Sequence, residues 1–195
     1  YDITRAEQDA YAIRSYQNAA LNTENGVLSN EIVGVCVPQR RGEPRLILED
    51  EEYKNVKFEK IPQLRAAFSP TGTVTAANAS TMNDGAAALI LASAAAVKKY
   101  DLKPLAKILS FADTAHEPAW FTTAPTHAAP KALALAKLAV TDVDYFEVNE
   151  AFSVVPLAFN KILNIDINKV NVHGGAVSLG HPLGASGARI VTTLQ

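Results

Sequence analysis

The chain has 195 residues, of which 48% are hydrophobic and 19% charged, a composition typical of a globular protein with a sizeable core. Its formal net charge of −2 excludes the broad basic field with which proteins grip nucleic acid. The single cysteine, Cys36, excludes an internal disulfide framework and a zinc site built on several thiolates. The longest apolar run, residues 86–97, is too short to cross a membrane. Because the chain starts at Tyr1 without a methionine, we expect a fragment of a longer protein.

The N-terminal part of the chain predicts a helix, a hairpin and a solvated loop. Thr4 and Glu7 form a capping box, which predicts a helix to about Leu21. The side of this helix expected to be apolar carries Ala6, Ala10, Ile13 and Tyr16. Residues 31–37 and 45–49 are rich in strand-forming side chains around a turn-rich segment, which predicts a β-hairpin. Residues 49–60 are highly charged and predict a loop.

From residue 73 onward, strand and helix patterns alternate. The predicted strands are residues 73–75, the first part of 86–100, 106–112, 145–148 and 170–173. The predicted helices are the second part of 86–100, then 130–138, 150–163 and a last helix that opens at Gly184. This alternation is typical of an α/β layered domain with a largely parallel sheet, whose ligand sites lie at the carboxyl ends of strands.

Unusual polar residues follow one of these predicted strands. Asn149 and Glu150 stand where an apolar strand stops and an amphipathic helix begins. Asn149 can donate a hydrogen bond to a substrate or a water, but on residue type alone a helix N-cap is the favoured interpretation. Glu150 is explained by the helix dipole, which favours a carboxylate in the first turn, and a catalytic carboxylate is the less favoured alternative.

A second strand end leads into a glycine-rich loop. Five of the ten glycines fall within residues 174–187, so this loop can approach a reacting group closely. His181 lies between Gly180 and Pro182 and is a candidate general base or oxyanion donor; the alternative is a histidine satisfied by backbone in a tight turn. The loop lacks both a Walker pattern and G-x-G-x-x-G. For Cys36, inside an apolar strand, a buried structural thiol is favoured over a nucleophile.

Three motifs together resemble the thiolase family. They are Asn149-Glu150-Ala151-Phe152, the run from Gly174 to Pro182 with Gly184 and residues 186–189, and the run from Thr75 to Ala87. The resemblance covers essentially the whole chain and is closest to the mitochondrial acetoacetyl-CoA thiolase branch. It implies a thiolase fold: two similar βαβαβαββ halves in α-β-α-β-α layers, with an inserted loop domain. Residues 1–72 would be the end of the loop domain, 73–103 the end of the N-terminal half, and 104–195 a truncated C-terminal half.

The resemblance implies a reaction and roles for two residues. The reaction is the reversible Claisen condensation of two acetyl-CoA, or thiolytic cleavage of acetoacetyl-CoA. His181 would activate a nucleophilic cysteine and help to form an oxyanion hole, and Asn149 would position a water in that hole. Covalent catalysis divides a difficult step into two, and fixed donors stabilise the developing oxyanion. Both cysteines of the family's active site correspond to no residue of this chain, and neither matches Cys36, so the chain alone is expected to be inactive.

The resemblance further implies contacts with coenzyme A and a possible ion. Ser80 would touch the pantetheine arm, Lys60 would lie near the nucleotide, and the pocket wall would contain Met82, Phe68, Ala151 and Phe152. A potassium ion would be held at Tyr16, Ala76, Ala79 and Val177. No transition metal, nucleic acid or membrane partner is expected.

The resemblance also implies assembly and location. The protein would self-associate as a homodimer or homotetramer and lie in the mitochondrial matrix, with cytoplasm or peroxisome as alternatives. Three other functions remain open: a 3-ketoacyl-CoA thiolase of fatty-acid β-oxidation, a non-catalytic thiolase-like carrier of CoA or lipid, and an unrelated nucleotide-binding module.

Overall fold

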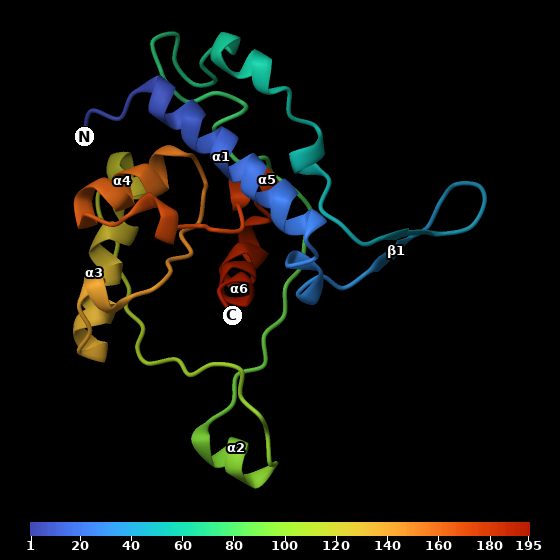
Figure 1. The fold of residues 1–195 in the computed structure, drawn as a ribbon, viewed down its shortest axis with the longest axis vertical. Helices are drawn as coiled ribbons and strands as arrows, with labels where there is room; N and C mark the ends of the chain where they lie inside the picture. The colour runs from blue at the N-terminus through green and yellow to red at the C-terminus, as the bar shows by residue number, and fades with distance from the viewer.

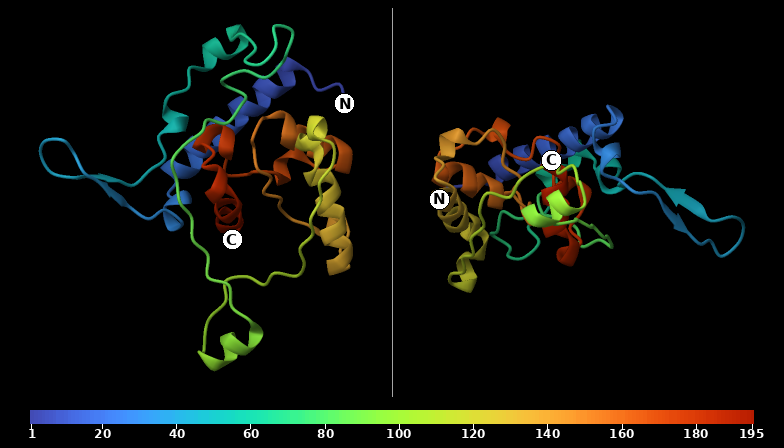
Figure 2. Two further views of the ribbon diagram at one scale, coloured as in Figure 1. Left: turned by 180° about the vertical axis from the view of Figure 1, so that it is seen from behind. Right: turned by 90° about the horizontal axis from the view of Figure 1, so that it is seen from below.

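A computed structural model describes all residues, 1–195. The chain order of the longer elements is α1 (Arg5–Glu24), β1 (Val35–Val37), β2 (Arg45–Ile47), α2 (Ala94–Lys99), α3 (Pro125–Ala136), α4 (Val154–Leu163), α5 (Ala176–Leu179) and α6 (Leu183–Thr193). Six short 3-10 helices, η1–η6, join them: Leu28–Asn30, Glu52–Lys54, Phe58–Gln63, Pro118–Thr123, Val140–Asp142 and Ile167–Lys169. Helix α1 lies across α5 and beside α4, and α2 lies at the end of a long excursion (Figure 1; Figure 2).

The capping box at the start of α1 is confirmed. The Thr4 amide donates to Glu7 Oε2 at 2.6 Å, and the Glu7 amide donates to Thr4 Oγ1 at 3.2 Å. The predicted buried side of this helix is partly wrong, because Ala6 and Ala10 are exposed. The buried residues combine polar and apolar side chains, namely Gln8, Asp9, Tyr11, Ala12, Ser15, Tyr16 and Ala19. Periodicity of apolar residues could not find this face, because the helix packs through hydrogen bonds as much as through apolar area.

The predicted hairpin is confirmed, and the predicted environment of its cysteine is wrong. Strands β1 and β2 pair antiparallel, with Cys36 opposite Leu46. The hairpin projects from the body of the chain (Figure 1), so Cys36 is exposed rather than buried. The apolar sequence of β1 therefore indicates that the strand pairs with β2, and not that its side chains are buried. The charged segment 49–60 that follows is largely exposed and contains η2 and the start of η3.

The other predicted strands are wrong as paired strands. Residues 73–75, 86–91, 106–112, 145–148 and 170–173 form no ladder, and the sheet contains only β1 and β2. What remains is isolated bridges, among them the parallel bridge Phe146↔Val170. A strand is stable only when a neighbouring strand satisfies its backbone groups, and within residues 1–195 these segments find almost none. The segment around Ile90, whose side chain is 95% exposed, is an example.

The predicted helices exist with shifted boundaries. Helix α3 begins at Pro125 and continues through Pro130, where the prediction had begun. Helix α4 begins at Val154, four residues after the predicted start at Glu150. Helix α6 begins one residue before Gly184. None of the helices combines the length and the apolar character that a bilayer crossing demands.

Two small apolar clusters hold the body together. Val148, Val155, Phe159 and Val170 form one, between α4 and the segments that precede and follow it. Ala12, Tyr16 and Val177 form the other, between α1 and α5. Ala151 and Phe152 of the Asn149 motif pack against the first cluster, and Val177 of the glycine-rich segment belongs to the second.

Candidate active site

The segment 78–83 connects the two motifs that the sequence analysis singled out. On one side, the Ser153 amide donates to the Asn78 carbonyl at 2.8 Å, and the Ser80 amide donates to the Ala151 carbonyl at 3.1 Å. On the other side, the His181 amide donates to the Thr81 carbonyl at 2.9 Å. Three stretches that are far apart in the sequence therefore meet at backbone level. The Ser80 hydroxyl adds a bond of 3.0 Å to the Ala151 carbonyl, which joins two of the predicted CoA contacts.

His181 is fixed by its backbone and by one ring nitrogen. Gly180 adopts a φ of +95° and lies so close to the Asn83 side chain that a Cβ would collide with it, so only glycine fits. The His181 ring is half-buried, and its Nδ1 lies 2.6 Å from Ser186 Oγ. Burial lowers the pKa of His181, and the Arg189 charge lowers it further. A neutral imidazole with one nitrogen engaged leaves the other nitrogen for chemistry.

Asn149 does not cap a helix, so the favoured residue-level interpretation is wrong. Helix α4 begins at Val154, its N-cap is Ser153, and no side chain caps it. The Oδ1 atom of Asn149 is buried and has no hydrogen-bond partner. Buried polar atoms are normally satisfied, so this amide oxygen can accept a hydrogen bond from a water or a ligand.

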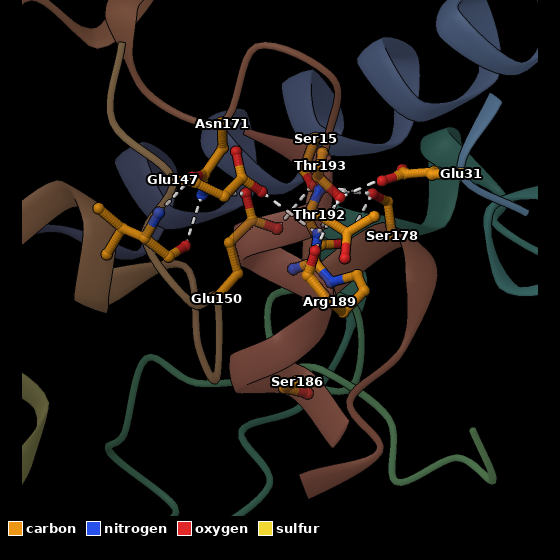
Figure 3. A network of polar contacts seen from close by, with 12 residues as sticks. Ser15, Glu31, Glu147, Glu150, Asn171, Ser178, Ser186, Arg189, Thr192 and Thr193 are labelled. Carbon is orange, nitrogen blue, oxygen red and sulfur yellow. Dashed lines mark hydrogen bonds and ion pairs between the residues drawn. The ribbon is translucent and has the colours of Figure 1, made fainter. Parts of the chain in front are cut away.

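Glu150 is not in the first turn of a helix, so the dipole explanation is wrong as well. Its side chain is fully buried and accepts four hydrogen bonds; two of the donor residues, Ser15 and Asn171, are drawn with it in Figure 3. Oε1 accepts from the Tyr11 hydroxyl at 2.7 Å and from Asn171 Nδ2 at 2.9 Å. Oε2 accepts from the Ser15 hydroxyl at 2.7 Å and from the Val177 amide at 3.1 Å. Glu150 thus ties α1, α5 and the Asn149 segment to one carboxylate.

The tyrosine in this network stays protonated. Burial raises the pKa of Tyr11 well above its usual value, and the neighbouring Glu150 carboxylate raises it further. A neutral phenol donates its proton to the carboxylate, and its oxygen accepts from Asn171 Nδ2 at 3.0 Å. Asn171 has a positive φ of 49°, which asparagine tolerates. Its Oδ1 accepts from the Val148 amide, and its Nδ2 donates to the Val148 carbonyl.

A second buried carboxylate lies on the same segment. Glu147 forms an ion pair with Arg189 of α6 at 3.2 Å (Figure 3). Burial raises the pKa of Glu147 to about 7; Arg189 opposes this shift and the nearby Glu150 adds to it. Arg189 Nη1 also donates to Thr193, which in turn donates to Glu31 at 3.1 Å. This group links α6 to the segment that follows α1.

Aromatic rings form a wall next to Ala151. The Phe68 and Phe152 rings lie edge to face with centroids 6.0 Å apart, so two predicted wall residues meet. Phe121 of η4 also packs on Phe152, with centroids 6.5 Å apart. Sequence reasoning missed Phe121, and the only signal for it was the adjacent aromatic pair with Trp120 between two prolines.

The remaining predicted residues lie farther from this centre or on its rim. Met82 is 86% exposed, and Lys60 is exposed on η3. Phe68 and Ala76 line an open hollow with residues 64–70. Tyr16 and Val177 lie together in the buried cluster between α1 and α5, whereas Ala79 pairs with Phe152. Burial raises the pKa of Tyr16 to about 12, so its phenol is neutral.

Comparison with known proteins identifies the class that this fold and site define. The N-terminal domain model of thiolases matches residues 1–95, and the C-terminal domain model matches residues 102–195. The chain belongs to the thiolase family. The structure of Acat5 thiolase from Ascaris suum in complex with coenzyme A superimposes with a TM-score of 0.90 at 46% identity, over 100% of this chain and 50% of that one. The thiolase fold is therefore confirmed.

Two curated relatives show which members of the family the chain resembles. The chain is 54% identical to the mitochondrial acetyl-CoA acetyltransferase of Bos taurus, over 99% of this chain and 46% of the relative. It is 53% identical to the cytosolic acetyl-CoA acetyltransferase ERG10 of Gibberella zeae, over 100% of this chain and 49% of the relative. The chain spans about half the length of the curated relatives it matches.

Proposed function

We propose that the protein containing this chain is an acetyl-CoA acetyltransferase, which condenses two acetyl-CoA or cleaves acetoacetyl-CoA with CoA. The observation that carries the proposal is the backbone pairing of segment 78–83 with both the Asn149 motif and His181. This pairing brings the residues of both motifs to one place. The similarity to two acetyl-CoA acetyltransferases over the whole chain supports the same reaction.

In the proposed mechanism His181 is the base that takes the proton of a cysteine thiol. The thiolate attacks the thioester carbonyl, CoA leaves, and the acyl group is held as a second thioester until it is transferred. Cys36 does not supply this thiol, because it lies exposed on the projecting hairpin. Within residues 1–195 no other cysteine exists. We therefore propose that the nucleophile comes from the part of the fold that the relatives contain and these residues do not.

Asn149 would act on the oxygen that becomes negative during the attack. Its buried Oδ1 atom can accept a hydrogen bond from a water, and that water can donate to the developing oxyanion. Together with a ring N–H of His181, this gives two donors for one oxygen. Neither role needs a metal ligand from this chain.

The wall beside Ala151 supports a short acyl substrate. Phe68, Phe121 and Phe152 present three aromatic rings at this wall, and bulky rings leave less space for a long acyl chain. Ser80, Met82 and Lys60 are proposed to follow the CoA arm outward from it. The relatives include a complex with coenzyme A, which supports CoA as the substrate carrier.

Other parts of the proposal concern an ion, the domains and the setting. Tyr16 and the backbone oxygens of Ala76, Ala79 and Val177 are neutral oxygen donors of the kind that potassium accepts. The domain division at residues 72 and 103 stays a prediction. Self-association and a mitochondrial location are proposed as well; similar proteins are both mitochondrial and cytosolic.

The deciding experiment measures thiolysis of acetoacetyl-CoA and of longer 3-ketoacyl-CoA by the full-length protein. We expect the highest kcat/KM with the four-carbon substrate, and no turnover by residues 1–195 alone. A preference for long acyl chains would instead identify a 3-ketoacyl-CoA thiolase. Full-length protein that binds CoA without turnover would identify a carrier and refute the proposal.

A further inference from the structure

The ring of His181 has one partner that the mechanism above does not use. Ser186 lies in the first turn of α6, its side chain is buried, and its Oγ lies 2.6 Å from His181 Nδ1. The same Oγ lies 3.2 Å from the Pro182 carbonyl, to which it donates. A serine hydroxyl has one proton and two lone pairs, so its bond to one neighbour dictates what it offers the other.

The Ser186 hydroxyl is placed to donate its proton to the Pro182 carbonyl, which also accepts the backbone amides of Ala185 and Ser186. The Pro182 carbonyl can only accept, and the Ser186 hydroxyl four residues later is placed for the i to i−4 bond common for serine in helices. With its proton on Pro182, Ser186 Oγ can only accept from the ring. Nδ1 must then carry the ring proton, which leaves Nε2 unprotonated in the neutral imidazole.

We propose that Ser186 is a positioning residue that holds His181 in the Nδ1–H tautomer, so that Nε2 is the free base. The inference rests on the proposed function. When the thiol proton moves to Nε2, the sulfur becomes a thiolate and the ring becomes an imidazolium. The Nδ1–H bond to Ser186 is unchanged by this step, and the new Nε2–H becomes the donor for the oxyanion. One hydroxyl thus serves both proposed roles of His181 without any change of rotamer.

Two features of the surroundings fit this assignment. The backbone of His181 is fixed by Gly180 and by the hydrogen bond from the His181 amide to the Thr81 carbonyl, so the ring turns only about its side-chain bonds. The lowered pKa of His181, caused by burial and by Arg189, keeps the ring neutral and able to accept a proton. A neutral ring is the form in which the choice of tautomer matters.

The test compares three variants of the full-length enzyme. Ser186→Ala removes the hydroxyl, and Ser186→Thr keeps one at the same position. Thr192→Val is the matched control, because Thr192 makes the same bond to a carbonyl four residues earlier in α6, at 3.0 Å, with no histidine as a second partner. We expect Ser186→Ala to lower kcat about 10- to 100-fold, part of the roughly 10²–10⁴-fold that a positioned base contributes. KM should change less than about twofold, since the ring acts on the reacting atoms and not on the CoA arm that binds the substrate.

A spectroscopic readout separates this proposal from the proposed function. Nitrogen-15 NMR of histidine-labelled full-length protein, with His181 assigned by its loss in His181→Gln, reports the protonated ring nitrogen. We expect Nδ1–H in the wild type, in Ser186→Thr and in Thr192→Val, and a shift toward Nε2–H in Ser186→Ala. An unprotonated Nδ1 in the wild type, or unchanged kcat in Ser186→Ala, would overturn the proposal. The NMR result stands whether or not the protein turns over acetoacetyl-CoA.

Discussion

The buried Glu150 carboxylate gives the sharpest test of the structure, through a pair of substitutions that change single atoms. Tyr11→Phe removes one donor and keeps the ring. A hydrogen bond to a charged group contributes about 1.5–3 kcal/mol to stability, and Tyr11 is only 3% exposed, so no water replaces the lost hydroxyl easily. We expect Tyr11→Phe to lower the free energy of unfolding by about 2 kcal/mol.

Glu150→Gln should cost more, although it keeps the shape of the side chain. If the amide nitrogen takes the place of Oε1, it faces Asn171 Nδ2, and if it takes the place of Oε2, it faces the Val177 amide. Tyr11 and Ser15 can turn their hydroxyls to accept, but Asn171 Nδ2 and a backbone amide cannot. At least one buried donor is therefore left opposite another donor. Together with the weaker bonds to a neutral group, this predicts a loss of about 3–5 kcal/mol.

The assay is equilibrium unfolding of the full-length protein in urea, for the wild type, both single variants and the double variant. Because Tyr11 and Glu150 share a bond of 2.7 Å, the double variant should lose less than the sum of the singles, by at least about 0.5 kcal/mol. Additive losses, or a Glu150→Gln variant as stable as the wild type, would refute the four-donor arrangement.

Three further predictions concern neighbouring residues. Glu147→Gln should flatten the pH dependence of stability, because burial raises the pKa of Glu147 from 4.5 to about 7 and the folded state therefore binds an extra proton. The wild type should lose up to about 3 kcal/mol of unfolding free energy as pH rises from 4.5 to 7, measured by urea unfolding. Parallel plots of unfolding free energy against pH for the variant and the wild type would contradict this. Gly175→Ala places a Cβ 2.6 Å from a Glu150 oxygen and should lower the melting temperature, whereas Gly187→Ala, in open space within α6, should leave it unchanged or raise it; equal effects would be inconsistent with the close approach. His181→Ala should abolish thiolysis of acetoacetyl-CoA by the full-length protein while CoA binding persists in calorimetry, and an unchanged kcat would exclude His181 as the base.

Local signals in the sequence predicted local structure well. The Thr4 capping box, the hairpin and the presence of helices at 94–99, 125–136, 154–163 and 183–193 follow from caps, turns and apolar spacing that act within a few residues. The observed start of α4 differs from the predicted one because the Asn149 motif precedes the helix. The Asn149 motif, residues 149–152, ends before the N-cap Ser153 of α4, because the Glu150 side chain bonds distant segments and Asn149 does not cap the helix.

The predicted strands show where sequence reasoning reaches its limit. Residues 106–112 have a strand-like composition, yet strand formation depends on a partner that local sequence cannot supply. The parallel bridge Phe146↔Val170 marks the one place where two of the predicted strands touch. The exposed Cys36 has the same cause, because strand propensity does not report burial on a projecting hairpin.

The candidate site was predicted through motifs rather than through residue physics. Residue type alone favoured a cap for Asn149 and a dipole role for Glu150, and the structure excludes both. The family resemblance directed attention to His181 and Asn149, whose roles stay predictions. Neither route gave Ser186 a role or found Phe121, because each matters through a contact made in three dimensions.

The hydrogen bonds from Tyr11 and Ser15 of α1 to Glu150 limit which homologous sequences can be recombined. Tyr11 and Ser15 on α1, and Glu150 with its neighbours almost 140 positions later, share one set of hydrogen bonds whose donors and acceptors must match. An apolar interface tolerates many combinations of side chains, but a buried polar one fails when a single member differs. Recombination between distant homologues with a crossover between α1 and residue 147 would separate these partners. A substitution at Tyr11 or Ser15 is therefore expected to be tolerated only together with a matching change around Glu150.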